Sequence, residues 1–68
     1  TLRLIRTNVF GVTQTAMAEI AGTRQATVSR WENGKLKPSL EQLVRIRKEA
    51  QRRGLKWNDS WFFEEIAA

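Results

Sequence analysis

The segment around Gly22 constrains the fold of this chain more strongly than any other. Apolar residues precede this glycine at helical spacing, and a second segment with helical spacing begins about three residues after it. Two helices joined by so short a turn cross at a steep angle. Ala18 is small where the helices would approach each other most closely, and Val28 would fill the space between them. The segment therefore predicts two short helices packed across each other.

The apolar pattern on the N-terminal side of this turn sets the limits of two helices. The first ends around Phe10, before Gly11, and is predicted by the near-helical spacing of Leu2, Leu4, Ile5 and Val9. Thr13 is placed to cap the second helix, which has Gln14 in its first turn and ends at Gly22.

Two further helices follow on the C-terminal side. Thr23 is a candidate cap for the third, which runs to Asn33 and is closed by Gly34. The sequence SLEQ at residues 39–42 fits a capping box, so a fourth helix should begin there. This helix ends at Gly54, and its predicted apolar positions are Leu40, Leu43, Val44 and Ala50.

The last twelve residues, WNDSWFFEEIAA, contain a fifth predicted helix. Asn58, Asp59 or Ser60 can cap it, and its apolar residues are Trp61, Phe62, Phe63 and Ile66. No segment shows strand alternation of useful length. We therefore predict a compact all-α fold of five helices, with one domain over residues 1–56 and an aromatic helix over residues 57–68 that closes the core.

The composition excludes several kinds of site. The chain contains no cysteine and no histidine, which removes disulfides, thiolate metal ligands and the commonest general base. The sequence also lacks a nucleophile–base pair, a carboxylate dyad and a phosphate-binding glycine loop. No apolar run approaches the roughly 18 residues of a membrane span. We therefore expect a soluble intracellular protein that is not an enzyme and that binds neither a metal nor a cofactor.

The charge of the chain is high and uneven. Twelve Lys and Arg residues against seven Asp and Glu give a net charge of +5. Residues 24–56 hold ten of the basic residues and three acidic ones, whereas residues 57–68 hold three acidic residues and no basic one. A concentrated positive charge favours a polyanionic partner, and the alternative is that the surplus charge only maintains solubility.

Residues 10–38, FGVTQTAMAEIAGTRQATVSRWENGKLKP, resemble the helix-turn-helix of the Cro/lambda-repressor (XRE-like) family of DNA-binding proteins. The matching residues are Gly11, Thr13, Gln14, Met17, Ala18, Gly22, Val28, Ser29, Trp31, Glu32, Asn33, Gly34 and Pro38. The resemblance implies a lambda-repressor-like domain that binds double-stranded DNA as a homodimer. It further implies a prokaryotic or phage transcriptional regulator, with a repressor favoured, that acts on a near-palindromic operator in the cytoplasm, at the nucleoid.

In this family the third helix enters the major groove, which assigns base contacts to Gln25, Ala26, Thr27 and Arg30. A glutamine can donate and accept together at adenine, which makes Gln25 the leading base reader. Ala26 and Thr27 offer methyl groups to thymine, and Arg30 can reach a guanine or a phosphate. For each of them the alternative is plain solvent exposure.

The second helix lies across the DNA backbone in this family, so the resemblance places Gln14 at a phosphate. The Gln14 side chain can also brace Gln25. Phosphate contacts are further expected of Arg24, Asn33, Lys35, Lys37 and Ser39. For the lysines the alternative is a solvated turn.

Glu32 is expected to be a structural residue. In the family the matching glutamate often pairs with an arginine of the first helix, at the position where this chain has Thr7. Arg3 and Arg6 are the two candidates to replace that arginine. The resemblance does not choose between them.

The C-terminal half of the chain has two further features. The basic residues from Arg45 to Lys56 are interpreted as a solvated face that attracts DNA at long range. Because the family often dimerises through its later helices, we assign the dimer contact to Trp57, Trp61, Phe62, Phe63 and Ile66. The alternative is burial of these side chains within one chain.

Two other functions fit the same pattern. One is a protein-interaction module that binds its partner through the Trp and Phe side chains, and the other is the targeting domain of a larger enzyme, such as a recombinase or modification system. An additional domain or partner protein outside this chain fits both. The polar face from Gln25 to Arg30 favours DNA, because an apolar docking surface does not need it.

Overall fold

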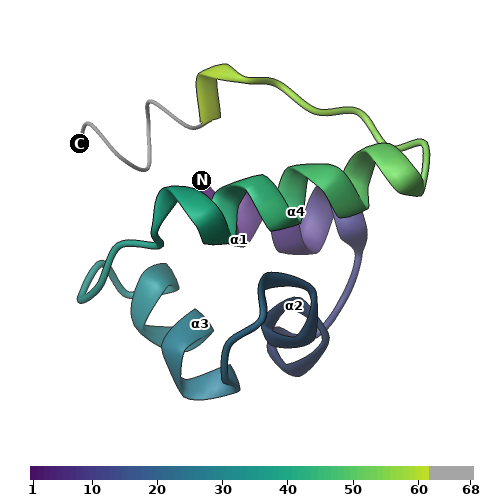
Figure 1. Cartoon of the computed structure of the whole chain (residues 1–68). Coiled ribbons are helices and arrows are strands. Elements are labelled where there is room, and N and C mark those ends of the chain that lie inside the picture. The colour runs from purple at the N-terminus through teal and green to yellow at the C-terminus, as the bar shows by residue number, and fades with distance from the viewer. Residues whose placement is uncertain (62–68) are drawn as a thin grey trace.

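A computed structural model of the chain describes residues 1–61 (Figure 1). Within these residues every regular element is a helix. The elements are α1 (Leu2–Leu4), η1 (Ile5–Phe10), α2 (Gln14–Ala21), α3 (Gln25–Glu32) and α4 (Leu40–Arg52). The all-α class is therefore confirmed, while the fifth predicted helix falls mostly on residues 62–68, outside the described part.

The helices enclose one apolar core. α4 extends along one side of α2 and α3, α1 lies behind α4, and α2 contacts both α3 and α4 (Figure 1). The buried cluster consists of Leu2, Ile5, Met17, Ala18, Ala21, Val28, Trp31, Leu43 and Ile46. All the helices from α1 to α4 contribute to it, so the orientation of α3 is fixed by residues from each of them.

The turn between α2 and α3 has the predicted structure. Gly22 adopts a φ of 73°, in the left-handed region where a glycine is favoured. Ala18 and Val28 are 3% and 1% exposed, as expected for side chains between crossing helices. The Arg45 guanidinium also lies over Gly22, at a place where a Cβ atom would come within 2.8 Å of Arg45 Cζ. The left-handed φ therefore favours glycine here, and a Cβ atom would in addition require the Arg45 side chain to move.

Two of the predicted helix caps are present, and the prediction of the third is wrong. The Thr13 side chain accepts from the Ala16 N–H at 3.1 Å, and Ser39 forms the capping box with Gln42. The third predicted cap, Thr23, does not cap α3. Its N–H donates to the Ala18 carbonyl at 2.8 Å, so Thr23 completes the turn that closes α2. Arg24 occupies the N-cap position of α3 without a side-chain hydrogen bond.

The first helical segment ends at Phe10 as predicted, but most of it is a π-helix. Thr7 Oγ1 donates to the Arg3 carbonyl at 2.8 Å, and the N–H groups of Gly11 and Val12 both donate to the Arg6 carbonyl. Apolar spacing over so few residues does not separate an α-helix from the wider π form, which is uncommon and appears mostly as single turns.

In α4 the predicted apolar face is partly wrong. Leu40 is 58% exposed, because it is the first residue of the helix and lies beyond the edge of the core. Ile46, which is not among the predicted apolar positions, is completely buried. The inner positions are Leu43, Ile46 and Ala50, which follow helical steps of three and four.

After α4 the chain turns back and runs along α4 towards the N-terminus (Figure 1). Trp57 and Trp61 are half-buried, and their rings meet edge to face with centroids 4.9 Å apart. Asp59 forms an ion pair with Arg47 at 3.6 Å. The Asn58 side chain accepts from the Ser60 N–H at 3.0 Å.

Candidate nucleic-acid interface

The N-terminal end of α3 presents the residues predicted to contact bases. Gln25 and Ala26 are its first two residues, and both are exposed, as is Arg30 one turn later. Thr27 is half-buried and therefore less accessible than these three. Val28 and Trp31 are buried, so the inner side of α3 is held against the core while its outer side stays open.

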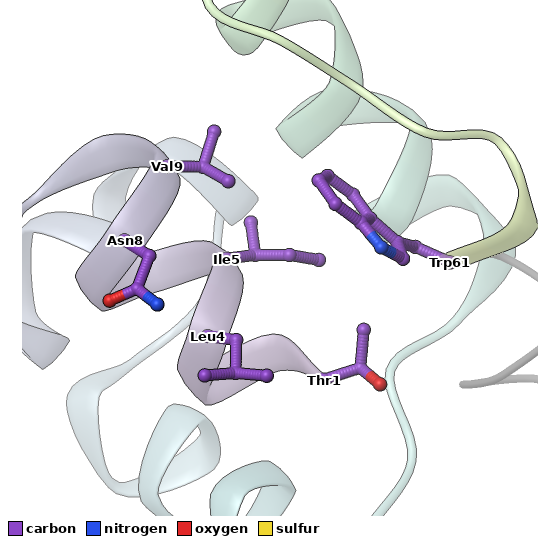
Figure 2. A pocket seen from close by; sticks show the side chains of 6 residues that line it. All are labelled: Thr1, Leu4, Ile5, Asn8, Val9 and Trp61. Atoms are coloured by element: carbon purple, nitrogen blue, oxygen red, sulfur yellow. The ribbon is translucent and has the colours of Figure 1, made fainter.

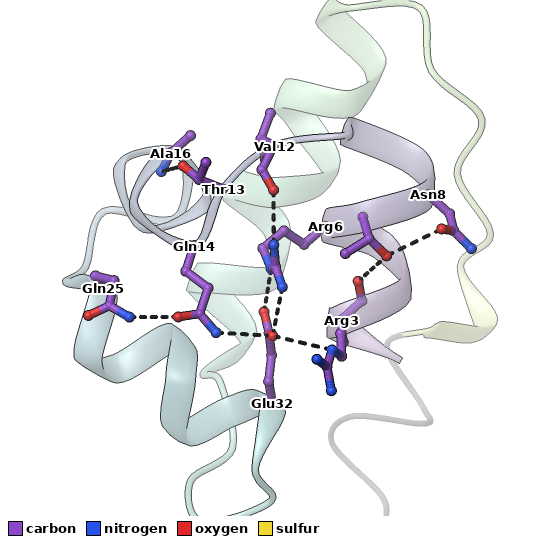
Figure 3. A network of polar contacts seen from close by, with 10 residues as sticks. Arg3, Arg6, Asn8, Val12, Thr13, Gln14, Ala16, Gln25 and Glu32 are labelled. Carbon is purple, nitrogen blue, oxygen red and sulfur yellow. Dashed lines mark hydrogen bonds and ion pairs between the residues drawn. The ribbon is translucent and has the colours of Figure 1, made fainter.

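A chain of hydrogen bonds connects the start of α3 to its end through α2 (Figure 3). Gln25 Nε2 donates to Gln14 Oε1 at 2.6 Å, and Gln14 Nε2 donates to Glu32 Oε1 at 3.2 Å. The contact predicted between Gln14 and Gln25 is thus present. We refer to the chain Gln25–Gln14–Glu32 as the amide relay. It fixes the Gln25 side chain before any ligand arrives.

Arg6 replaces the arginine that the family pattern places in the first helix. Its Nε donates to Glu32 Oε2 at 2.6 Å and its Nη2 to Glu32 Oε1 at 3.0 Å, while Nη1 donates to the Val12 carbonyl at 3.0 Å. The Glu32 side chain is only 4% exposed. Arg3 is peripheral, because its Nε lies 4.0 Å from Glu32 and its side chain is 74% exposed. The structure therefore selects Arg6 over Arg3.

The buried pair should make the stability of the domain depend on pH. The hydrogen bonds from Arg6 lower the pKa of Glu32 below its ordinary value of 4.5, and the Gln14 hydrogen bond adds to this effect. The ionised carboxylate thus stabilises the folded state. That contribution is complete above pH 4.5 and is lost as the pH falls through the lower pKa of the folded protein. We expect the free energy of unfolding in urea to decrease as the pH falls below about 5.

Glu32→Gln should flatten this decrease, because the substituted residue does not titrate. Glu49 provides a comparison at a distance from the interface: hydrogen bonds from Arg52 and Arg53 lower its pKa to about 2, so it contributes a slope of the same sign. Glu49→Gln should remove only the part of the pH dependence that Glu49 contributes. An unchanged slope in the Glu32→Gln variant would contradict the assignment of the buried pair.

The N-terminus of α2 is open to an anion. Thr13 satisfies the Ala16 N–H, whereas the N–H groups of Gln14 and Thr15 have no acceptor within the helix. The positive end of the helix dipole lies at the same place. Arg24, at the N-cap of α3, is exposed. These groups could together bind a phosphate beside the start of α3.

The loop between α3 and α4 extends this positive surface. Asn33, Lys35 and Lys37 are exposed, whereas Pro38 is buried and fixes the loop to the domain. Ser39 Oγ accepts from the Gln42 N–H at 3.2 Å, and its hydroxyl proton can still be donated to another acceptor. Between residues 20 and 40 the only acidic residue is Glu32, which is paired with Arg6. The charge left on this surface is positive.

Residues 2–55 match the family model described as helix-turn-helix, a range that contains all the helices from α1 to α4 and the surface described above. The chain belongs to the Cro/lambda-repressor-like helix-turn-helix family. No curated protein and no solved structure matches the chain. Its family gives it a DNA-binding fold of the transcription-regulator type, with α3 in the position of the recognition helix. Within residues 1–61, no helix has the length and apolar character that a bilayer span requires.

In this helix-turn-helix domain many of the α4 cations have partners within the chain. Arg52 and Arg53 both pair with Glu49, and Arg47 pairs with Asp59. Arg53 also lies over the Phe10 ring, 5.6 Å from its centroid. Lys48 and Lys56 are exposed, and the Arg52 side chain is 71% exposed within its pair, so this run still lies on a solvated face.

Sequence reasoning missed three features of the surface. It did not find the hydrogen bond from Gln14 to Glu32, because the two residues are 18 positions apart and no local spacing relates them. It did not find the contact of Arg45 with Gly22, for the same reason. It also overlooked Leu36, which is 45% exposed between the two loop lysines. The exposure of Leu36 could have been predicted, because it is an isolated apolar residue in a polar turn.

The aromatic C-terminal residues are only partly described. Trp57 and Trp61 pack against the core of their own chain, and Trp61 forms one wall of a groove of about 290 Å³. Figure 2 shows its lining, which consists of Thr1, Leu4, Ile5, Asn8, Val9 and Trp61. Phe62, Phe63 and Ile66 lie outside the described residues, so the predicted dimer contact stays a prediction.

Proposed function

We propose that this domain binds a specific sequence of double-stranded DNA and regulates transcription, with repression the favoured outcome, as a homodimer on a near-palindromic operator at the nucleoid. The observation that supports this most strongly is the amide relay. It holds an exposed glutamine in a defined orientation at the start of α3, where the family places its base readers.

The relay leaves Gln25 with the hydrogen-bonding groups that adenine needs. One N–H of Gln25 is used on Gln14. The other N–H and Oε1 remain, and they complement adenine N7 and the N6 amino group. Ala26 and Thr27 contribute methyl groups against thymine, and Arg30 contacts either a guanine or a phosphate.

Phosphate contacts position α3 in the groove. The free N–H groups at the start of α2 and the exposed Arg24 bind the backbone on one side of the groove. The α3–α4 loop binds it on the other side, through Asn33, Lys35, Lys37 and Ser39. Gln14 itself faces the relay, so its contribution to phosphate binding comes from its backbone N–H.

The size of the domain is compatible with a dimer on DNA. Its principal extents are 30 × 25 × 20 Å. Half-sites one helical turn apart place two copies about 34 Å from each other, so neighbouring copies come close to contact. We assign the contact between them to Trp57, Trp61, Phe62, Phe63 and Ile66.

Selection of bound duplexes from a random pool tests the proposal as a whole. A palindromic site with half-sites about 10 bp apart, centre to centre, is the expected result for a dimer. A single asymmetric half-site would remove the homodimer from the proposal and leave sequence-specific binding intact. Recovery of unrelated sequences would overturn sequence-specific binding.

Gln25→Ala is expected to weaken binding to the selected site by about 1–3 kcal/mol and to leave binding to random DNA nearly unchanged. Lys35→Ala is the matched control. It should weaken binding to both DNAs and reduce the dependence of affinity on salt, because a phosphate contact has no base preference. Fluorescence anisotropy at several salt concentrations gives both quantities. Equal losses on the two DNAs for Gln25→Ala would remove Gln25 from the base readers.

A further inference from the structure

We infer that Glu32, which lies away from the exposed face of α3, determines which base pair Gln25 prefers, because it fixes the orientation of both relay amides. The inference rests on the DNA-reading function proposed above. It makes Glu32 a positioning residue that acts on specificity through Gln14.

The direction of the relay follows from the chemistry of its last member. An ionised carboxylate accepts hydrogen bonds and cannot donate them. Gln14 must therefore turn its amino group towards Glu32, as the 3.2 Å contact shows, and its oxygen towards Gln25. Gln25 must in turn donate its amino group to Gln14, as the 2.6 Å contact shows. One carboxylate thus orients two amides in sequence (Figure 3).

Reversal of the relay would change the groups that Gln25 presents. In the observed orientation Gln25 keeps one donor and one acceptor free, which matches adenine. In the reversed orientation its oxygen would accept from Gln14, and its amino group, with two donors, would point outward in place of the oxygen. Two donors match guanine, which presents the acceptors N7 and O6 in the major groove. The two orientations therefore select different base pairs.

The burial of Glu32 makes this orientation stable. Its side chain is 4% exposed, and Arg6 occupies both of its oxygens. An arginine has donors only, so it requires acceptors from residue 32. In a Glu32→Gln variant one of the two Arg6 donors loses its acceptor. With the amide oxygen kept on Arg6 Nε, the shorter contact at 2.6 Å, the amino group would take the Oε1 position, which Gln14 shares with Arg6 Nη2. Gln14 would then accept instead of donating, and the relay would reverse.

The test compares the affinity for duplexes that carry A·T or G·C at the base pair contacted by Gln25, at one fixed salt concentration. The wild type should prefer A·T by about 5- to 150-fold. In Glu32→Gln this ratio should fall below one, in favour of G·C. Thermal unfolding followed by circular dichroism establishes that the variant is folded.

Two further variants separate orientation from structural support. Exchange of the two side chains, Gln14→Glu with Glu32→Gln, again places a carboxylate where it accepts from Gln25, and so it should restore the preference for A·T. Gln14→Leu leaves the Arg6–Glu32 pair intact and removes only the relay, so the A·T ratio should fall several-fold. A role of Glu32 in stability alone predicts neither result.

The outcomes distinguish this inference from the proposed function. If the wild type shows no preference at any base pair, the proposed function fails. If a preference exists but Gln25→Ala does not change it, Gln25 is not a base reader, and this inference is overturned while sequence-specific binding stands. If that preference exists and folded Glu32→Gln keeps the wild-type ratio, the inference is overturned and the function stands. If Glu32→Gln does not fold, Gln14→Leu decides, and an unchanged ratio in that variant overturns the inference.

Discussion

Arg6→Met should destabilise the domain by about 3–5 kcal/mol, because it leaves a buried carboxylate without its partner. Glu32 is 4% exposed and receives two hydrogen bonds from Arg6, at 2.6 and 3.0 Å. The remaining contact, from the Gln14 amide at 3.2 Å, is neutral and does not replace a guanidinium. In so small a domain this loss is a large part of the total stability. Urea unfolding at pH 7 measures it.

Arg3→Met is the matched control for this substitution. Arg3 is 74% exposed and 4.0 Å from the same carboxylate, so its removal should cost about 0–1 kcal/mol. Equal losses for the two variants would show that Arg6 does not stabilise Glu32 more than a surface residue does.

Ile46→Ala should destabilise the domain by about 2–5 kcal/mol, because a completely buried side chain would be replaced by a cavity. Ile46 is on α4 and belongs to the same cluster as Val28 and Trp31 of α3. The substitution should therefore also weaken binding to DNA, since it loosens the support of α3. The loss of stability is measured by urea unfolding at a single protein concentration.

Leu40→Ala removes a similar side chain from the same helix and serves as the control. Leu40 is 58% exposed, so the expected change in stability is within about 0.5 kcal/mol. A comparable loss in both variants would mean that the inner face of α4 has been assigned to the wrong residues.

The features of the fold that depend on neighbouring residues could be predicted from the sequence. Thr13 and Ser39 each bond a backbone N–H three residues later, so their roles follow from residue type and spacing. Gly22 and Val28 follow from the requirement of a tight turn between crossing helices. The position of α3 could be predicted for this reason, whereas the candidate base readers on it came from the resemblance to the Cro/lambda-repressor family.

The features that depend on distant residues could not be predicted in the same way. Arg6 and Glu32 are 26 positions apart, and the sequence left Arg3 as an equal candidate because helical register in so short a segment is uncertain. The π-helix that contains Arg6 changes that register. Likewise, the exposure of Leu40 depends on where the core ends, which is a property of the assembled helices.

The most direct test of base reading by α3 is a competition titration at fixed ionic strength, with the selected duplex labelled. Unlabelled selected duplex and a scrambled duplex of equal length are compared as competitors. Sequence-specific binding predicts that the scrambled duplex competes about 10³-fold less well, and that Gln25→Ala reduces this ratio. Equal competition by both duplexes would contradict sequence reading by α3.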